Sequence, residues 1–385
     1  MNIKDEYFSR IIYQKNAVEN LSGILKADFQ SKKVFFISSK TAYQKFGTAV
    51  ANEFNRAGCE FIFKFFDGNE DKQQIEAAAK EGENCKIVVS LGGGSVIDTG
   101  KFLAKTLNAP HIVIVSNPTT TAAFSNFCFV NDKNVIKKID CNYAHKILID
   151  EVMILKASSQ SVNGAKEFLL SFWEVYFNLQ VSSLLFGEKK QISGLLMVLA
   201  KLQDNNLYSN ENQGLLVMDM LIDLGFYLKD INTPYQTALS LALMLKNSGA
   251  IVAHFGKLCL VSASMLLSSY KKFFSLKKLD TYSFLNFESL ASSLKILNIH
   301  AQSVTFNEVK SVRNNKQLFL KLNAIRNQVL ALIEKCENEI ESNQNQKIKT
   351  FFDIKKCLSV FEVLPYVQNC SPLTNVLSST GLIVS

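Results

Sequence analysis

The sequence predicts an α/β domain with a parallel sheet, followed by an all-helical domain. In roughly the first 150 residues, short apolar runs alternate with helical stretches, which is the pattern of βαβ units. Three consecutive glycines separate one apolar run from the helix that follows it. From about residue 157 onward nearly every segment has helical periodicity. We therefore expect two domains, 1–155 and 156–385.

Composition agrees with an ordinary globular protein. The chain has 385 residues, of which 48% are hydrophobic and 20% charged, so it can bury two cores. The net charge of +8 is spread as isolated lysine pairs, without a dense basic block interleaved with aromatic residues. This pattern favours solvated faces and anionic small-molecule substrates, and we expect no nucleic-acid partner.

Cysteine usage and hydropathy bear on the compartment. The eight cysteines are scattered and form no CxxC pair, which is typical of a reducing cytosol. The N-terminus lacks the apolar stretch of a signal peptide, and no apolar run approaches about 18 residues. We expect a cytoplasmic protein without a membrane span.

The elements of the first domain can be placed in order. The residues from 7 to 14 suit an edge strand, and 127–134 resembles a hairpin. Fully apolar runs indicate buried parallel strands, whereas periodic stretches indicate the helices between them. The expected strands are 33–39, 60–66, 86–90, 111–115 and 146–150, and the expected helices are 17–25, 43–57 and 71–81. In the second domain we expect helices at 167–185, 191–202, 213–228, 237–246, 256–270, 287–297 and 316–340.

The strand that ends at Leu91 leads into Gly92, Gly93 and Gly94, and a helix starts near Ser95. Glycines have no Cβ atoms, so an anion can approach their amide groups closely. The helix would add its positive dipole end and unpaired N–H groups, as in a phosphate cradle. The spacing is neither GxGxxG nor that of a P-loop, and an ordinary glycine turn is the alternative.

A wider block carries a resemblance to a known superfamily. The pattern GGGSxxDxxK is followed by a strand at 111–115 and then by Pro118-Thr119-Thr120. This arrangement resembles the glycerol dehydrogenases, glycerol-1-phosphate dehydrogenases, iron-containing alcohol dehydrogenases and dehydroquinate synthases. The resemblance implies a dehydroquinate synthase-like fold, with a Rossmann-like nucleotide-binding domain before the helical one. It implies contacts to NAD or NADP from Gly92, Gly93, Gly94, Ser95, Asp98, Thr119 and Thr120.

The end of the 33–39 strand bears on the choice of cofactor. Ser38, Ser39 and Lys40 supply no acid to pair with a ribose 2′-hydroxyl. Small hydroxyls and a lysine could accept a 2′-phosphate, so NAD and NADP both stay open. We place Ser38 and Ser39 among the cofactor-binding residues.

The resemblance also implies a divalent metal, zinc, nickel or iron, held by one carboxylate and two histidines. A motif similar to GxxDxxxxxxE places Glu167 at the carboxylate position, with Glu174 seven residues further on. The alternative is that Glu167 is an acid favoured by a helix dipole. His254 lies in a segment resembling the one that carries a metal histidine, and we take Glu167 and His254 as metal ligands.

Three departures from the superfamily pattern stand out. Where a second histidine and a glutamate are expected, the sequence has Phe255 and Lys257. Lys257 could replace metal charge or bind a substrate phosphate. Phe124 stands at or near the position of an aspartate that touches the substrate hydroxyl in the family.

These observations predict an oxidoreductase resembling glycerol-1-phosphate dehydrogenase. It would transfer hydride between a nicotinamide and a small, phosphorylated polyol or ketone, with Glu167, His254 and Lys257 as catalytic residues. One alternative is a lyase or cyclase resembling dehydroquinate synthase, which the glutamate at 167 favours. Another is a catalytically altered nucleotide-binding protein, because one metal histidine is missing. A homodimer is compatible with either class.

Overall fold

The computed structural model divides the chain into two compact units. Unit 1 comprises 1–165 and 205–226, and unit 2 comprises 166–204 and 227–385. The expected boundary near residue 155 stays a prediction, because unit 1 also takes in 156–165 and 205–226. The residues that the structure describes are 3–30, 32–66, 71–133, 135–186, 192–203, 211–229, 238–239, 242–243, 246, 253–275 and 316–342.

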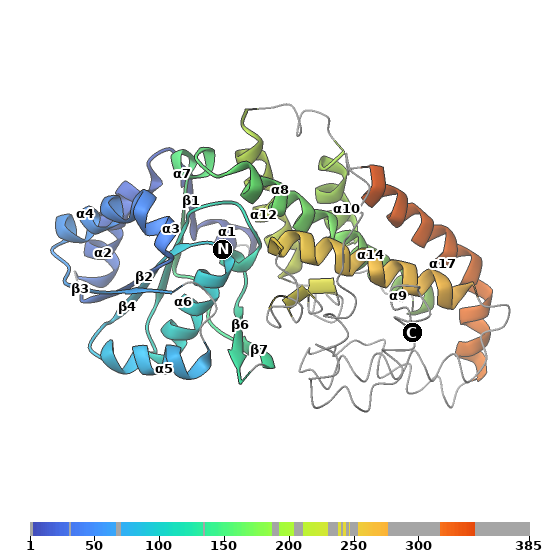
Figure 1. The fold of residues 1–385 in the computed structure, drawn as a ribbon, viewed down its shortest axis with the longest axis horizontal. Helices are drawn as coiled ribbons and strands as arrows, with labels where there is room; N and C mark the ends of the chain where they lie inside the picture. The colour runs from blue at the N-terminus through green and yellow to red at the C-terminus, as the bar shows by residue number, and fades with distance from the viewer. Residues whose placement is uncertain are drawn as a thin grey trace. The chain divides into compact units, whose positions relative to one another are not determined.

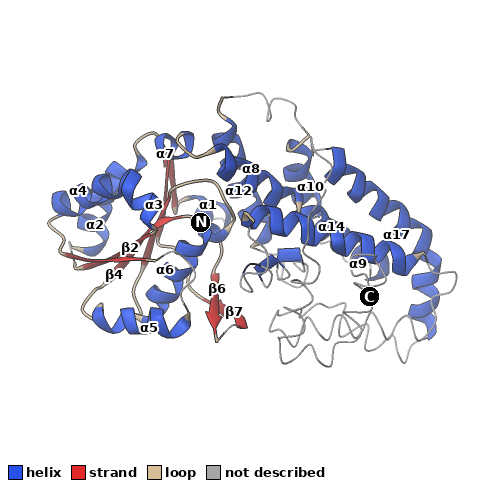
Figure 2. Cartoon of the chain, in the orientation of Figure 1, coloured by secondary structure: helices blue, strands red, loops and turns tan. Residues whose placement is uncertain are grey.

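Unit 1 is built on a six-stranded, all-parallel sheet with the order β1-β8-β5-β4-β2-β3. Figures 1 and 2 show strands β2 and β4 of this sheet with helices around them. Three of its strands, β2, β4 and β5, are buried along their whole length, as their continuous apolar sequences predict. The strands are β1 Ile11–Gln14, β2 Val34–Ser38, β3 Phe61–Phe65, β4 Ile87–Gly92, β5 His111–Val115 and β8 Lys146–Asp150.

Helices cover both faces of this sheet. Helices α2 Leu21–Phe29 and α4 Thr48–Ala57 pack on the face that carries Phe36 and Val89. Helices α5 Lys72–Glu81 and α6 Gly94–Thr106 pack on the opposite face (Figure 1). The other helical elements of the first 165 residues are α1 Ile3–Phe8, η1 Ala17–Asn20, α3 Lys40–Ala42, the π-helical η2 Tyr43–Gly47, η3 Ala122–Phe124, α7 Glu151–Leu155 and the start of α8 Ser159–Leu170.

The chain reverses its direction across the sheet between β2 and β4. From β2 it steps outward to β3, then returns to the other side of β2 and continues through β4, β5 and β8. In open α/β sheets, ligands bind outside the carboxyl ends of the strands at such a switch point. The three glycines follow β4 at this point, so the topology itself marks them as a candidate site.

A separate antiparallel hairpin packs against α6. It consists of β6 Phe127–Asp132 and β7 Val135–Asp140, as the hairpin-like sequence predicts. Buried Cys128 and Val130 pack with α5 and α6 in one apolar cluster. The hairpin is therefore fixed to the helix that begins at the glycine turn.

The remaining described segments are helical, as predicted. In unit 2, α9 packs against α17 and α14 packs against both. The expected helix 287–297 and most of 237–246 lie outside the described residues. None of the described helices is long and apolar enough to span a membrane. The later helices are α9 Phe172–Phe186, α10 Ile192–Lys201, α12 Gln213–Leu228, α14 Phe255–Phe274 and α17 Lys316–Ser342.

Candidate functional site

The glycine turn leaves no room for larger residues. Strand β4 ends at Gly92 and helix α6 begins at Gly94, with Gly93 as the residue before the helix. A Cβ atom on Gly94 would lie 2.7 Å from Oγ1 of Thr120, and one on Gly93 would lie 3.1 Å from Oδ1 of Asn117. The side chains of Asn117 and Thr120 take up these Cβ positions, so the close packing of the turn requires glycine at both. The turn leads directly into a helix N-terminus, the element that binds the diphosphate of a dinucleotide in such folds.

The segment after β5 closes on this turn. The amide of Gly94 donates to Oγ1 of Thr119 at 3.3 Å, which connects the segment to the start of α6. Thr120 accepts through Oγ1 from the amide of Ala122 at 3.2 Å and so shapes the turn into η3. The structure thus brings Thr119 and Thr120 to the glycines, where the motif predicted them.

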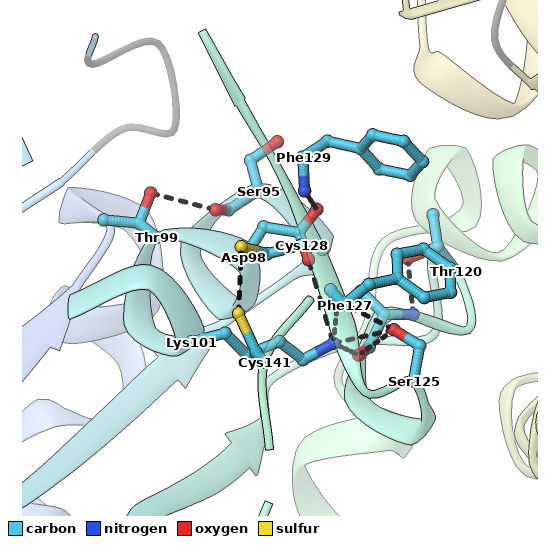
Figure 3. A network of polar contacts seen from close by, with 12 residues as sticks. Ser95, Asp98, Thr99, Lys101, Thr120, Ser125, Phe127, Cys128, Phe129 and Cys141 are labelled. Atoms are coloured by element: carbon cyan, nitrogen blue, oxygen red, sulfur yellow. Dashed lines mark hydrogen bonds and ion pairs between the residues drawn. The ribbon is translucent and has the colours of Figure 1, made fainter. Parts of the chain in front are cut away.

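Asp98, one turn into α6, faces the hairpin. Its Oδ2 accepts from the amide of Phe129 at 3.3 Å, and its Oδ1 lies 3.9 Å from Nζ of Lys101 (Figure 3). Ser95 lies at the start of the helix, and its carbonyl accepts from the Thr99 hydroxyl at 3.1 Å. The cofactor contacts predicted for Asp98 and Ser95 stay predictions.

Lys101 is the charged centre of this network. Its side chain is fully buried, and its ammonium donates to the carbonyl of Ala122, to Oγ of Ser125 at 2.7 Å and to the carbonyl of Phe127 at 2.8 Å (Figure 3). Burial lowers the pKa of Lys101, and the nearby Asp98 carboxylate opposes that shift. The three oxygens accept from the three N–H donors of the ammonium, and the nearby carboxylate compensates for the lost hydration of its charge. Lys101 therefore ties α6 to the segment from 122 to 127.

Phe124 is part of the core of unit 1. It is 1% exposed, and a Cβ atom on Gly225 of α12 would lie only 2.5 Å from its own Cβ. The ring therefore occupies a tightly packed position in η3. No polar group stands at this position to contact a substrate hydroxyl.

The hydroxyls at the end of β2 have intramolecular partners. Ser38 is fully buried and donates to the carbonyl of Leu91 at 2.9 Å, across to β4. Ser39 is the N-cap of α3 and accepts from the amide of Ala42 at 3.2 Å. The contact of Ser38 and Ser39 with the cofactor stays a prediction. The neighbouring Lys40 is exposed to solvent.

The residues predicted for catalysis lie in unit 2. Burial raises the pKa of the half-buried Glu167, and the charge of Lys257 opposes the rise. Lys257 itself is exposed, in the first turn of α14. The structure therefore places Lys257 within electrostatic range of Glu167.

His254 immediately precedes α14. Its Nδ1 accepts a hydrogen bond from the amide of Gly256 at 3.4 Å, and burial lowers its pKa, with a further contribution from Lys246. The lowered pKa favours the neutral imidazole of His254, which is the form that binds a metal. Residues 247–252, which complete the predicted histidine motif, lie outside the described residues.

The metal requirement can be tested against these donors. Within the described part of the chain, no three His, Cys, Asp or Glu side chains are grouped so that they could hold a metal ion. Glu167 and His254 would supply two donors, whereas the family site needs three protein ligands. The described residues therefore fit a dinucleotide but do not by themselves fit the expected metal.

Comparison with known proteins supports the motif assignment. Residues 9–155 match the family of iron-containing alcohol dehydrogenases. Hydroxycarboxylate dehydrogenase A of Escherichia coli is 28% identical over 152 residues, which cover 38% of this chain and 41% of that protein. Glycerol-1-phosphate dehydrogenase of Picrophilus torridus is 21% identical over 196 residues, 51% of this chain and 56% of that protein. The N-terminal part of the chain, residues 9–155, is therefore similar to the iron-containing alcohol dehydrogenases.

Solved structures confirm the fold expected for this superfamily. Glycerol dehydrogenase of Schizosaccharomyces pombe has a TM-score of 0.54 at 14% identity, over 89% of this chain and 92% of that one. An archaeal alcohol dehydrogenase from a Red Sea brine pool has a TM-score of 0.60 at 11% identity, over 96% of both chains. The chain spans about half the length of the curated relatives that it matches by sequence, 41% and 56% in the two cases above.

Two buried polar residues near the glycine turn were not among the predicted site residues. Lys101 is the lysine of GGGSxxDxxK, and its position three residues after Asp98 could have indicated a shared helix face. His111 is buried on β5 and contacts Oγ of Ser90 through Nε2 at 2.8 Å. Nothing in the sequence around His111 distinguishes it from the apolar strand that contains it.

Proposed function

We propose that this protein is an NAD(P)-dependent dehydrogenase that interconverts a small alcohol or polyol and its ketone. The glycine turn at the switch point of the sheet carries this proposal. It combines consecutive glycines, a helix N-terminus and the adjacent Thr119, which are elements that a diphosphate site uses. The match of residues 9–155 to the iron-containing alcohol dehydrogenases and the similarity to a glycerol-1-phosphate dehydrogenase support the same reaction class.

For the substrate we propose a phosphorylated polyol or ketone, such as dihydroxyacetone phosphate. Sequence similarity to two archaeal glycerol-1-phosphate dehydrogenases supports this choice. The exposed Lys257 could pair with the substrate phosphate, and Glu167 lies within range of its charge. Glu167 and His254 are proposed as two metal ligands, although the described residues do not supply a third.

The test is oxidation of NADH and NADPH by the purified protein with dihydroxyacetone phosphate. Parallel reactions contain added zinc, nickel or iron, or a chelator, and unphosphorylated dihydroxyacetone serves as the matched substrate. Turnover with the phosphorylated ketone alone would support the full proposal. Tight dinucleotide binding without turnover under any of these conditions would contradict dehydrogenase activity and favour a repurposed nucleotide-binding protein.

A further inference from the structure

Two cysteines face each other across the hairpin. Cys128 lies in β6, where it is paired with Ile139, and Cys141 follows the end of β7. The amide of Cys141 extends the ladder by donating to the carbonyl of Asn126 at 2.7 Å. Positions 128 and 141 are therefore diagonal neighbours on one face of the hairpin. Their Sγ atoms are 3.4 Å apart (Figure 3).

We propose that Cys128 and Cys141 are a redox modification site, which forms a reversible disulfide when the protein meets a peroxide. A disulfide requires an Sγ–Sγ distance of about 2.05 Å, and the two atoms already lie in direct contact. The β6–β7 hairpin is a two-stranded sheet of its own, separate from the six-stranded sheet. A small shift between its strands would close the bond without disturbing the main sheet.

The two thiols differ in a way that assigns their roles. Cys141 is half-buried, whereas Cys128 is fully buried. The hydrogen bond with Cys128 lowers the pKa of Cys141, and the charges of Lys101 and Lys105 act in the same direction. Cys141 is therefore the thiol that a small oxidant can reach as a thiolate. The same hydrogen bond, together with burial, raises the pKa of Cys128, which makes it the resolving thiol.

The chemistry needs hydrogen peroxide as the oxidant. The Cys141 thiolate attacks one peroxide oxygen, the O–O bond breaks, and the sulfur becomes a sulfenic acid while hydroxide leaves and takes up a proton as water. The Cys128 thiol then attacks that sulfur, the S–O bond breaks, and the second oxygen leaves as water with the Cys128 proton. Two thiols are thereby oxidised to one disulfide, and one peroxide is reduced to two waters.

The site lies next to the contacts that hold α6. The residues on either side of Cys128 supply the Phe127 carbonyl to Lys101 and the Phe129 amide to Asp98. A shift of β6 during disulfide formation acts on both contacts at once. We therefore expect the oxidised protein to bind NADH or NADPH more weakly, by about threefold or more. This loss of dinucleotide affinity rests on the proposed function, whereas formation of the disulfide does not.

Peptide mapping tests the proposal directly on the full-length protein. Trypsin is expected to release Cys128 in the peptide 106–133 and Cys141 in the peptide 139–146, because lysines separate them. The reduced protein is treated with hydrogen peroxide, its free thiols are alkylated in denaturant, and the digest is analysed by mass spectrometry. We expect the two peptides to appear as one disulfide-linked species that a dithiol reductant separates.

Two variants control the assignment. Cys141→Ser should abolish the linked species, whereas Cys85→Ala, which alters another buried cysteine of the same apolar cluster, should retain it. Two separate alkylated peptides after peroxide treatment, or Cys141 found as a sulfinic acid or linked to a different cysteine, would overturn the proposal. A disulfide that leaves dinucleotide affinity unchanged would retain the modification site and overturn its coupling to α6.

Discussion

The ammonium of Lys101 donates to the carbonyl of Phe127 at 2.8 Å, which joins the middle of α6 to the first residue of β6. Helix α6 begins at the glycine turn, and the segment before β6 carries Thr119 and Thr120. One buried cation therefore holds together the two stretches of chain that form the candidate nucleotide site. The buried Lys101 thus helps to fix the geometry of that site.

Replacing Lys101 with methionine should destabilise the protein and weaken dinucleotide binding. The change keeps most of the side-chain volume but removes the ammonium that donates to all three oxygens, and the single Ser125 hydroxyl proton cannot replace its three hydrogen bonds. We expect a loss of about 1–3 kcal/mol in the free energy of unfolding. Urea unfolding and titration with NADH measure the two effects.

Lys105→Met is the matched control. This exposed lysine, one turn further along α6, donates to the carbonyl of Asp140. Its loss should cost less than about 0.5 kcal/mol. Equal effects of the two substitutions would contradict the special role of Lys101.

Gly100→Ala should destabilise the protein through overpacking. The added Cβ atom would lie 2.6 Å from Nε2 of His111 and 3.0 Å from Cβ of Ser90, in the contact between α6 and the sheet. Such overpacking costs about 1–3 kcal/mol. Gly23→Ala in α2 has no atom within 4 Å of the new Cβ and should stabilise the helix by about 0.5–1 kcal/mol. Thermal unfolding of both variants checks the opposite signs.

Much of unit 1 could be predicted from sequence because local and global signals agree there. The runs at 34–38, 87–92 and 111–115 are mostly apolar and form fully buried parallel strands. The predicted edge strand at 7–14 is confirmed only in its second half. Strand β1, Ile11–Gln14, pairs with β8, whereas residues 7 and 8 belong to the helix Ile3–Phe8. Its short length leaves periodicity too few residues to separate the two states.

The candidate site could be predicted only in part. The glycines and Thr119 follow from local motif spacing, and the structure brings them together. The partners of Ser38 and Lys101 depend on strand order and on a contact across more than 20 residues. Sequence spacing holds no information on such contacts, so the hydrogen bond from Ser38 to β4 could not be predicted, and the contact of Ser38 with the cofactor stays a prediction. The Cys128–Cys141 contact needed the hairpin register for the same reason.

His111 should make the protein less stable as the pH falls. Burial, with the charge of Lys101, lowers its pKa to about 3 in the folded protein, whereas an unfolded histidine has a pKa of about 6.5. Between these values the unfolded chain binds a proton that the folded protein does not. Stability contributed by the neutral ring is therefore lost as the pH falls from about 6.5 toward 3, by about 1.5 kcal/mol from pH 6.5 to pH 5.

Free energies of unfolding measured across this pH range test the assignment. His111→Gln should flatten the decline by that amount relative to the wild type. His145→Gln alters a partly exposed histidine that contacts Oδ2 of Asp28 at 2.8 Å, and it controls for the loss of any histidine. An unchanged slope in His111→Gln would show that this ring is not the group responsible.

Substitutions of Glu167 and Lys257 should change the free energy of unfolding in opposite directions at pH 7. Burial raises the pKa of Glu167, so the folded protein keeps a proton there that the unfolded chain has released, and stability falls as the pH rises through that raised pKa. Glu167→Gln removes this loss and should stabilise the protein at pH 7. Lys257→Met removes the opposing charge and should destabilise it by about 0.2–1 kcal/mol at pH 7, since Lys257 is exposed.

At about pH 3, below the ordinary glutamate pKa of about 4.3, Glu167 is largely protonated in both states, and the effect of Lys257→Met should be much smaller. Lys257→Arg keeps the charge and should resemble the wild type at both pH values. Unfolding at the two pH values, with NADH oxidation measured in parallel, separates a structural acid from a functional one. A Glu167→Gln variant that is more stable but inactive is the result expected of a carboxylate kept for chemistry at the expense of stability. A Gln variant that is less stable and fully active would instead identify Glu167 as part of the fold of unit 2.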